Sequence, residues 1–217
     1  MLTDVSQLKG GMNVRHKQSQ GFTLIELLVV VAIIGILMTL LLPALAKGKL
    51  KAQQTECASN QRQVGLAFRM FADEHDNRLP MQVSVRRGGT LEYANRGETW
   101  RHFQVMSNLL VNPKLIVCPA DKQRASTNWS GLGQLNLSLF VGLDAKIGKS
   151  NHILAGDRNI MTPGYPTPGV VPVRTNMTAF WTEEMHQNRG NLLFADGHVE
   201  SLDSDGLQRS ISRHGLK

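Results

Sequence analysis

Glu26 has the most unusual chemical setting in this chain, because it stands inside an apolar run. The run extends from Gly21 to Leu42, and after Glu26 no charged side chain follows until Lys47. About 20 apolar residues are enough for a helix to cross a bilayer. A carboxylate at that depth costs a few kcal/mol of free energy, so Glu26 is a candidate functional group. In such a low-dielectric setting it is expected to pair with a cation.

Two cysteines, Cys57 and Cys118, are candidates for a single disulfide. The basic residues Lys9, Arg15 and Lys17 precede the apolar run, and such a flank is typical of the cytoplasmic side of a membrane. The rest of the chain then lies outside the cytoplasm, where cysteines can be oxidised. The closed loop of roughly 60 residues stabilises the fold by about 4 kcal/mol in the chain-entropy model. Two separate buried thiols remain the alternative, whereas a metal pair lacks the usual cysteine spacing.

Residues with metal-ligating atoms gather near the C-terminus: His186, Asp196, His198, Asp203 and Asp205. The segment 203–206 resembles a fragment of an oxygen-ligand calcium loop but lacks the rest of that pattern. The favoured interpretation is structural, with Asp196 serving a turn and His186 hydrogen-bonding the backbone to hold a loop. We therefore expect no metal and no cofactor, and bound calcium is the alternative.

No motif of an enzyme active site is present in the sequence. A serine or cysteine nucleophile motif is missing, and the Gly-x-Gly at Gly131 neither follows a convincing strand nor opens a helix. We therefore expect that the chain is not an enzyme. An arginine-rich region, formed by Arg86, Arg87, Arg96 and Arg101, could contact nucleic acid. A solvated surface loop is favoured, because aromatic residues for base stacking are not interleaved there.

The segment 44–75 is predicted to continue the apolar helix as an amphipathic one. Leu50, Cys57, Val64 and Phe71 recur every seven residues, and most charged residues lie elsewhere around the helix. Pro43 removes one backbone donor, so it is expected to kink the helix without ending it. Asp76 to Pro80 carries a stop-and-turn pattern, which predicts the end of the helix.

The remainder of the chain predicts short helical and extended segments separated by loops. A short amphipathic helix is expected from Trp100 to Leu110. Strands are expected at 115–118, 135–143 and 152–157, the second with one buried face because apolar residues alternate along it. The segments 191–195 and 198–202 flank Asp196-Gly197, which predicts a hairpin with a tight primed turn.

The N-terminal pattern resembles that of type IV prepilins and type II secretion pseudopilins. The resemblance rests on the basic leader, the residues Gly21-Phe22-Thr23-Leu24-Ile25-Glu26 and the apolar helix that follows. It implies that a prepilin peptidase cuts between Gly21 and Phe22, that Phe22 is N-methylated and that Glu26 serves in assembly. Pro43 also stands where many of these proteins carry a helix-kinking proline. The new amine of Phe22, in the same chain or a neighbouring subunit, is then a partner for Glu26, and a repeated head-to-tail contact builds open filaments.

A second resemblance lies at the other end of the chain. His186 is followed, after nine residues, by Asp196-Gly197. This spacing resembles a C-terminal signature of a large group of prepilin-like proteins, whose chemical role the sequence does not show. Pseudopilins of the secretion type can also bind calcium in a C-terminal loop, which is why calcium stays open.

An ordinary secretory signal peptide is the main rival to prepilin processing. Ala44-Leu45-Ala46 offers a small-residue cleavage site after the apolar run, and cleavage there would release a protein beginning at Lys47. The long leader and the position of Glu26 argue against it. The alternatives to a filament subunit are thus a secreted or membrane-tethered binding protein or enzyme, and a DNA-binding uptake pilin.

Together the patterns predict an α+β protein in which a long N-terminal helix packs on a small antiparallel sheet. The 217 residues, with a net charge of +7, leave room for one modest domain and an anchor. We expect a leader at 1–21, a transmembrane and filament-core helix at 22–46, and a head at 47–217 whose part from 76 onward is a loop-rich β region.

The expected location is the inner membrane, crossed once, with the head outside the cytoplasm. Expected partners are prepilin peptidase, the assembly machinery and other pilin-like subunits, and we do not expect nucleic-acid binding. The type of filament and the rank of the subunit stay open.

Overall fold

The computed structural model describes residues 22–163, 169 and 177–214. The predicted leader, 1–21, lies outside these residues. The chain divides into two compact units, one ending at Leu45 and the other beginning at Ala46.

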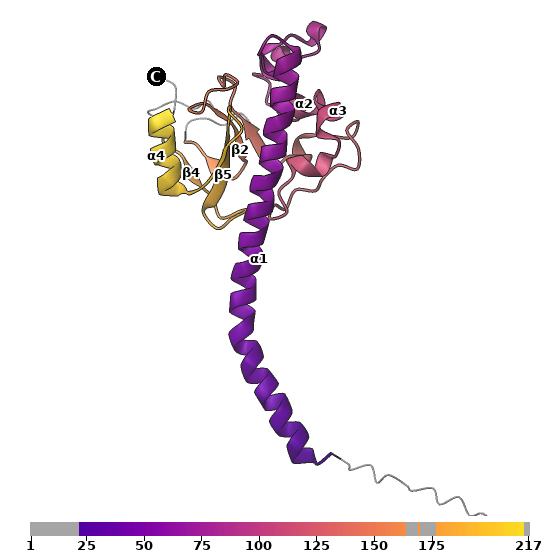
Figure 1. Cartoon of the computed structure of the whole chain (residues 1–217), viewed down its shortest axis with the longest axis vertical. Coiled ribbons are helices and arrows are strands. Elements are labelled where there is room, and N and C mark those ends of the chain that lie inside the picture. Colours follow the sequence, from indigo (N-terminus) through magenta and orange to yellow (C-terminus); the bar gives the residue numbers. More distant parts are fainter. Residues whose placement is uncertain (1–21, 164–168, 170–176, 215–217) are drawn as a thin grey trace, which may run out of the picture. The chain divides into compact units, whose positions relative to one another are not determined.

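Helix α1 extends from Leu24 to Glu74 and contributes residues to both units (Figure 1). Pro43 lies within it and does not end it, as expected, since strong helix formers follow. The helix ends where predicted. Asp76 and Asn77 have left-handed backbone angles, with φ of 55° and 58°, and the amide of Asn77 donates to the carbonyl of Ala72 at 2.9 Å. Such a left-handed ending satisfies carbonyls that the last helical turn leaves without partners.

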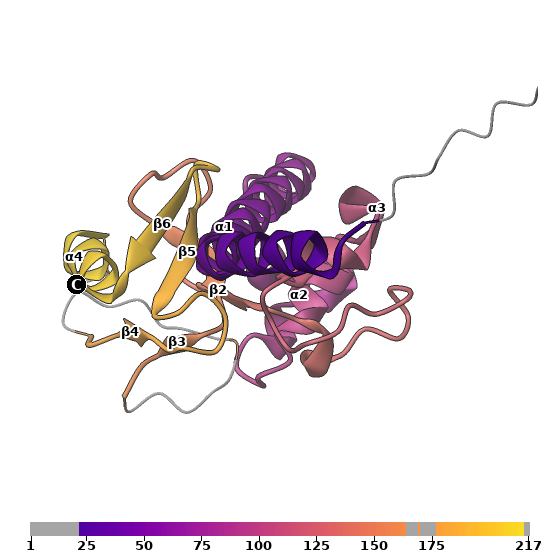
Figure 2. The same cartoon turned by 90° about the horizontal axis from the view of Figure 1, so that it is seen from below.

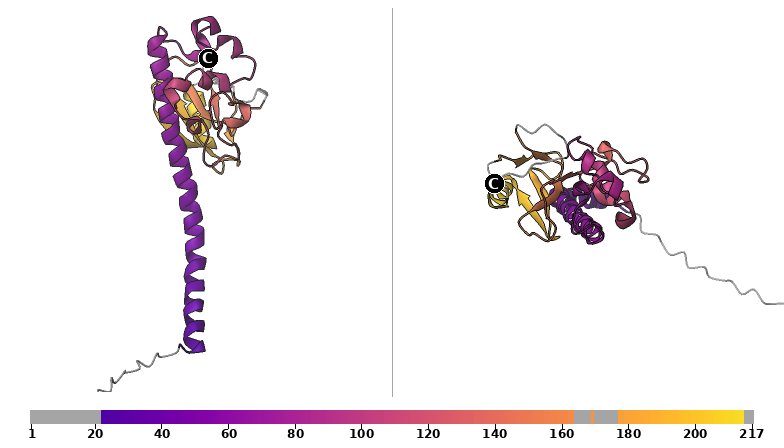
Figure 3. Two further views of the ribbon diagram at one scale, coloured as in Figure 1. Left: turned by 90° about the vertical axis from the view of Figure 1, so that its right-hand side faces the viewer. Right: turned by 90° about the horizontal axis from the view of Figure 1, so that it is seen from above.

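The half of α1 that belongs to the second unit buries one face in that unit's core. Val64, Phe68 and Phe71 are buried there, and Figure 3 shows this half of the helix along one side of the unit. The predicted seven-residue repeat is therefore confirmed. Two buried glutamines, Gln54 and Gln61, interrupt the apolar face and have no counterpart in the prediction.

The main sheet is antiparallel and has the strand order β1-β2-β5-β6. A separate two-stranded sheet pairs β3 with β4. The strands are β1 Leu139–Val141, β2 Ile153–Asp157, β3 Ile160–Met161, β4 Phe180–Trp181, β5 Arg189–Phe194 and β6 Val199–Asp203. The strand predicted at 152–157 and the predicted hairpin are confirmed, whereas the strand predicted at 135–143 is only three residues long.

Both faces of β1 and β5 are buried, not one as predicted for 135–143. Leu139 and Val141 of β1 join the apolar cluster that contains Phe68, while Phe140 between them joins a second cluster on the opposite face. Strand β5 divides in the same way, because Leu193 faces the first cluster and Leu192 the second. Alternate side chains of a strand point to opposite faces, so two covering layers are needed.

The second covering layer is helix α4, Ser204–His214, which the sequence reasoning missed. Its buried residues Leu207 and Ile211 pack into the second cluster together with Trp181, and Figure 2 shows α4 beside β4 and β6. Only two apolar residues four positions apart marked the helix in sequence, which is a weak periodic signal.

The segment between α1 and the sheet is built from very short helices. The expected helix at 100–110 is present as two pieces, α2 Trp100–Gln104 and α3 Ser107–Leu110. The strand predicted at 115–118 is wrong, since Pro113–Ile116 is a 3₁₀ helix. Further 3₁₀ helices are Pro80–Gln82, Val85–Arg87, Leu91–Tyr93 and Gln134–Asn136. Proline at the first turn of such a helix needs no backbone donor, which explains Pro80 and Pro113.

Replacing Phe68 with alanine is expected to reduce the free energy of unfolding by about 3–5 kcal/mol. The Phe68 ring is fully buried and lies edge-on to Phe103, with ring centroids 5.8 Å apart. Urea unfolding of the detergent-solubilised full chain, followed by tryptophan fluorescence, measures the change. Leu66→Ala is the matched control, because Leu66 is 64% exposed on the same helix. Equal losses in the two variants would contradict the assigned buried face.

Candidate functional site

The start of α1 holds Glu26 in a local hydrogen-bond arrangement with Thr23. One carboxylate oxygen, Oε2, accepts from the backbone amide of Thr23 at 2.9 Å and from its hydroxyl at 2.8 Å. The Thr23 hydroxyl in turn accepts from the amide of Glu26 at 3.3 Å. This is a capping box, in which the residue just before the helix and the third residue of the helix satisfy each other's backbone donors. The carboxylate is thereby held next to the residue that follows Phe22, and Gly21 lies outside the described residues.

The apolar side chains that follow Glu26 are exposed within the chain. Every large apolar residue from Leu24 to Leu42 that is described has an exposed side chain, and Phe22 is 79% exposed. Helix α1 contains a window that is apolar and long enough to cross a membrane. An apolar surface of this extent in water carries a large free-energy cost, so it requires an apolar environment supplied from outside the chain.

The predicted disulfide between Cys57 and Cys118 is present, with the two Cα atoms 5.2 Å apart. Cys57 lies on the buried face of α1 and Cys118 follows the 3₁₀ helix 113–116, and both are buried. The bond therefore ties the helix to the long irregular segment before β1. The alternative of two separate thiols does not apply to this structure.

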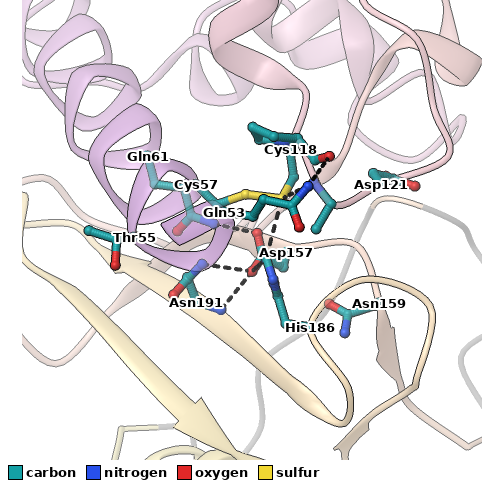
Figure 4. The surroundings of a disulfide bond; sticks show 12 residues. Gln53, Thr55, Cys57, Gln61, Cys118, Asp121, Asp157, Asn159, His186 and Asn191 are labelled. Carbon is teal, nitrogen blue, oxygen red and sulfur yellow. Dashed lines mark hydrogen bonds and ion pairs between the residues drawn. A yellow bond between two sulfur atoms is a disulfide. The ribbon is translucent and has the colours of Figure 1, made fainter. Parts of the chain in front are cut away.

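A buried polar cluster lies against this disulfide and was not predicted. Its centre is Asp157 at the end of β2, whose carboxylate is fully buried (Figure 4). Gln61 of α1 donates to Oδ1 at 2.7 Å. Asn191 of β5 donates to Oδ2 twice, from its backbone amide at 2.8 Å and from its side chain at 3.0 Å. Three donors from two other elements thus converge on one acidic group.

His186, the histidine of the C-terminal signature, completes the cluster. Its Nε2 lies 3.2 Å from the sulfur of Cys118 and 3.5 Å from Oδ2 of Asp157. The expectation that His186 bonds to the backbone is therefore wrong in its detail, because its ring contacts the disulfide and a carboxylate. That His186 holds the loop before β5 stays a prediction. Sequence spacing could not reveal Asp157 as its neighbour, since 29 positions separate them in the chain.

Burial shifts both titratable groups of this cluster toward their neutral forms. Removal of water raises the pKa of Asp157 from 3.8 to about 7, against the hydrogen bonds from Asn191 and Gln61, which favour the ionised form. Burial lowers the pKa of His186, while the charge of Asp121 acts in the opposite direction. A neutral Asp157 beside a neutral His186 is consistent with both shifts.

A neighbouring ion pair was also missed by the sequence reasoning. Arg158 donates to both oxygens of Asp121, each at 2.6 Å, and to Glu184 at 3.0 Å. Burial favours the neutral form of Asp121, but the hydrogen bonds from Arg158, Ser138 and Gln123, together with the charge of Arg158, hold its pKa below the ordinary value. A two-pronged contact of this kind fixes the segment after Cys118 to the end of β2.

The Asp-Gly part of the signature forms the turn at the opposite end of β5. Gly197 has φ of 97°, its amide donates to the carbonyl of Phe194 at 2.9 Å, and the amide of Phe194 donates to the carbonyl of His198 at 2.9 Å. Positive φ occurs only at Gly197 in this turn, so it is a three-residue loop and not the predicted two-residue primed turn. Asp196 serves the turn as expected, accepting from the amide and the ring of His198 at 3.1 and 2.6 Å.

The hairpin tip also approaches α1 closely. A Cβ atom added to Gly65 would lie 2.9 Å from a methyl carbon of Leu193 and 3.7 Å from the Cα of Gly197. The two halves of the signature therefore lie at the two ends of β5, next to Cys57 and Gln61 in one case and next to Gly65 in the other. The signature residues thus flank β5, whose Leu193 lies against Gly65 of α1.

The segment 203–206 does not form the calcium loop considered from the sequence. It is the junction between β6 and α4, and Oδ1 of Asp203 caps the helix by accepting from the amide of Gly206 at 2.8 Å. Asp196 is held by His198, and Asp205 belongs to the first turn of α4. Among the described residues, one group of three metal-ligand atoms lies close together, formed by Cys57, Cys118 and His186, and its two sulfurs are bonded to each other.

The arginines considered for nucleic-acid contact do have aromatic neighbours, contrary to the sequence reading. The guanidinium of Arg101 lies 4.3 Å from the ring centre of Tyr93 and 4.4 Å from that of Trp100, and it also pairs with Glu98. Arg96 stands 5.9 Å from the Tyr93 ring. These rings stack on the protein's own cations, so they are not a free platform for bases.

A long apolar helix packed on a small antiparallel sheet defines a pilin-like α+β architecture, and the capping box places a carboxylate at the head of that helix. Residues 16–42 match the family model for the prokaryotic N-terminal methylation motif. The chain is 41% identical over 61 residues to the type IV major pilin protein PilA of Myxococcus xanthus strain DK1622, which is 28% of this chain and 28% of that protein. The chain thus covers about a quarter of the length of that relative. No solved structure matches the chain. The findings support a type IV prepilin-like protein.

Asp157→Asn is expected to remove a pH dependence from the stability of the folded chain. Because the pKa of Asp157 is about 7 in the folded chain and 3.8 ordinarily, the unfolded chain loses this proton first as pH rises. The contribution of Asp157 to the free energy of unfolding therefore falls between about pH 4 and pH 7, by about 1 kcal/mol per pH unit, and is constant above. Urea unfolding of wild type and variant across this range measures the difference.

In that experiment the wild type should lose stability relative to D157N as pH rises. Asp73→Asn is the control, since its carboxylate is exposed and pairs with Arg69 on the surface of α1. Stability curves that stay parallel for wild type and D157N would show that the buried carboxyl does not titrate in this range.

Proposed function

We propose that this chain is the precursor of a filament subunit, cut between Gly21 and Phe22 by prepilin peptidase and assembled into a type IV pilus or a type II secretion pseudopilus. The observation that carries the proposal is the exposed apolar surface of residues 24–42 directly after a matched methylation motif. In this proposal the surface lies in the inner membrane before assembly and in the filament core afterwards. The second unit then lies outside the cytoplasm, where its disulfide is stable.

The assembly role of Glu26 follows from the chemistry of the cut. Cleavage after Gly21 converts the amide nitrogen of Phe22 into an ammonium group, and the Glu26 carboxylate is already held at Thr23, the next residue. In an apolar environment an unpaired carboxylate is strongly disfavoured, so it pairs with an ammonium group of its own or a neighbouring subunit. Pairing between subunits sets an axial register, and the repeated head-to-tail contact propagates without closing.

This pairing is needed because apolar burial alone does not favour leaving the membrane. Lipid tails are about as apolar as leucine side chains, so moving the helix from lipid to a filament core changes its hydrophobic free energy little. Specific contacts between subunits must therefore make the filament preferable, and the Glu26 pair is the charged contact that this segment offers. Energy for extraction comes from the assembly machinery in this proposal.

Sequencing the N-terminus of the native membrane-bound protein tests the processing step. We expect the mature chain to begin at a methylated Phe22, because the motif places the cut there. Mass spectrometry of the intact protein measures both the cut and the added methyl group. A mature chain beginning at Lys47 would instead identify an ordinary signal peptide, and a retained leader would exclude peptidase processing.

Glu26→Ala is expected to be cut and inserted in the membrane but to be missing from filaments, because the variant lacks the carboxylate for pairing. Immunoblotting of sheared filaments and of membranes measures how much of the variant is incorporated. We expect the amount in filaments to fall at least about tenfold relative to wild type. Glu56→Ala is the matched control, an exposed carboxylate on the same helix, and should incorporate normally. Normal incorporation of E26A would remove the role given to this residue.

A further inference from the structure

A pocket of about 290 Å³ lies in the second unit between α1 and the loop that leads into β5. Helix α1 contributes four of its lining residues, at the spacing of one helical face. The loop and the start of β5 contribute the other three. The lining residues are Lys47, Leu50, Lys51 and Gln54 from α1, and His186, Gln187 and Arg189.

The charge of this pocket is positive. Lys47, Lys51 and Arg189 line it, and none of its lining residues is acidic. Within the part of the chain that the structure describes, none of these three cations belongs to an ion pair. Behind the wall, Oδ2 of Asp157 lies 3.5 Å from Nε2 of His186. Burial raises the pKa of that carboxyl to about 7, which lessens its opposition to an anion.

Two buried polar groups in the wall have no partner among the described residues. Gln54 is only 5% exposed, and its Nε2 has no hydrogen-bond acceptor. His186 has a side chain that is 2% exposed, and its Nδ1 is also without a partner. Buried donors are almost always satisfied in folded proteins, so the orphan amide of Gln54 points to an acceptor that is not part of the chain.

His186 is held from behind the wall by contacts of Nε2. This nitrogen lies 3.2 Å from Sγ of Cys118 and 3.5 Å from Oδ2 of Asp157. A disulfide sulfur carries no hydrogen, so Nε2 is the donor in its hydrogen bond to Cys118, and Nδ1 of the neutral ring carries no proton. The pocket then presents one neutral N–H donor, on Gln54, and three cationic side chains, a set that matches the oxygen atoms of a phosphate group.

We propose that this pocket binds an anionic phosphate group, carried by a phospholipid head group or by free phosphate. The lipid source is favoured by position in the helix, because Lys47 is the first charged residue after the apolar run that follows Glu26. Basic residues at the end of a membrane span attract anionic lipid head groups. The proposal goes beyond filament assembly, since it requires neither cleavage at Gly21 nor contact between subunits.

The test uses the full chain in lipid-free detergent micelles and follows thermal unfolding by tryptophan fluorescence. The probes are phosphatidylglycerol, which carries a net negative charge, phosphatidylcholine, which carries none, and inorganic phosphate. We expect phosphatidylglycerol to raise the melting temperature in a saturable way and phosphatidylcholine to leave it nearly unchanged. A response to phosphatidylglycerol alone assigns the lipid head group, and a response to inorganic phosphate assigns the phosphate group irrespective of lipid.

Lys51→Gln is expected to weaken the apparent affinity for the effective probe at least tenfold. Lys49→Gln is the matched control, because it removes the same charge from the same helix at a residue that does not line the pocket, and it should change the affinity less than twofold. Arg189→Gln, on β5, repeats the test from the other wall.

Three results would overturn the proposal. They are no response to any of the probes, equal responses to phosphatidylglycerol and phosphatidylcholine, and equal losses in K49Q and K51Q. The last would mean that general positive charge attracts the anion and that the pocket has no part in it. Because Lys49 and Lys51 are both exposed, neither substitution is expected to unfold the chain.

Discussion

The fixed contact between α1 and β5 is the constraint on which the second unit depends. Gly65 of the helix lies against Leu193 of this strand and close to Gly197 of the hairpin tip. The same part of the helix is bonded through Cys57 to Cys118 and through Gln61 to Asp157 of β2, the strand paired with β5. The buried carboxyl of Asp157 connects the helix to β2 and β5 at once, since its acceptor oxygens take donors from Gln61 and Asn191. Removing one partner of such a group leaves an unsatisfied polar atom in the core, which makes the arrangement specific as well as stable.

One continuous helix serves two different environments. From Ala46 on, its buried side is covered by the chain's own core, while the large apolar residues described between Leu24 and Leu45 are exposed. The capping box at Thr23 and Glu26 keeps the start of the helix ordered and keeps a carboxylate at its head. A helix of this kind is stable only when apolar groups from outside the chain cover it. Lipid tails in a membrane and apolar faces of other helices can both provide that cover.

The C-terminal signature acquires a structural meaning from the positions of its residues. His186 and Asp196-Gly197 lie on either side of β5. The nine residues between His186 and Asp196 are therefore the end of the preceding loop and the strand that packs against α1. At one end a histidine ring contacts the disulfide and a carboxyl, and at the other a glycine with positive φ closes the turn. The pocket beside His186 lies at the first of these ends, so a ligand bound there would bear on the same contact between helix and strand.

The sequence alone determined the features that depend on neighbouring residues. The apolar run with Glu26, the amphipathic repeat through Val64 and Phe71, the end of α1 at Asp76 and the Asp-Gly hairpin are local patterns, because helix and turn formation is governed by residues a few positions apart. The pairing of the cysteines was also accessible, since there were only two. Tertiary structure alone decided what depends on distant segments meeting: the cover of the second sheet face by α4, the 3₁₀ helix in place of a strand before Cys118, and the convergence of Gln61, Asp157, His186 and Asn191. Burial of those polar groups, and hence the raised pKa of Asp157, arises only when four separate elements exclude water together.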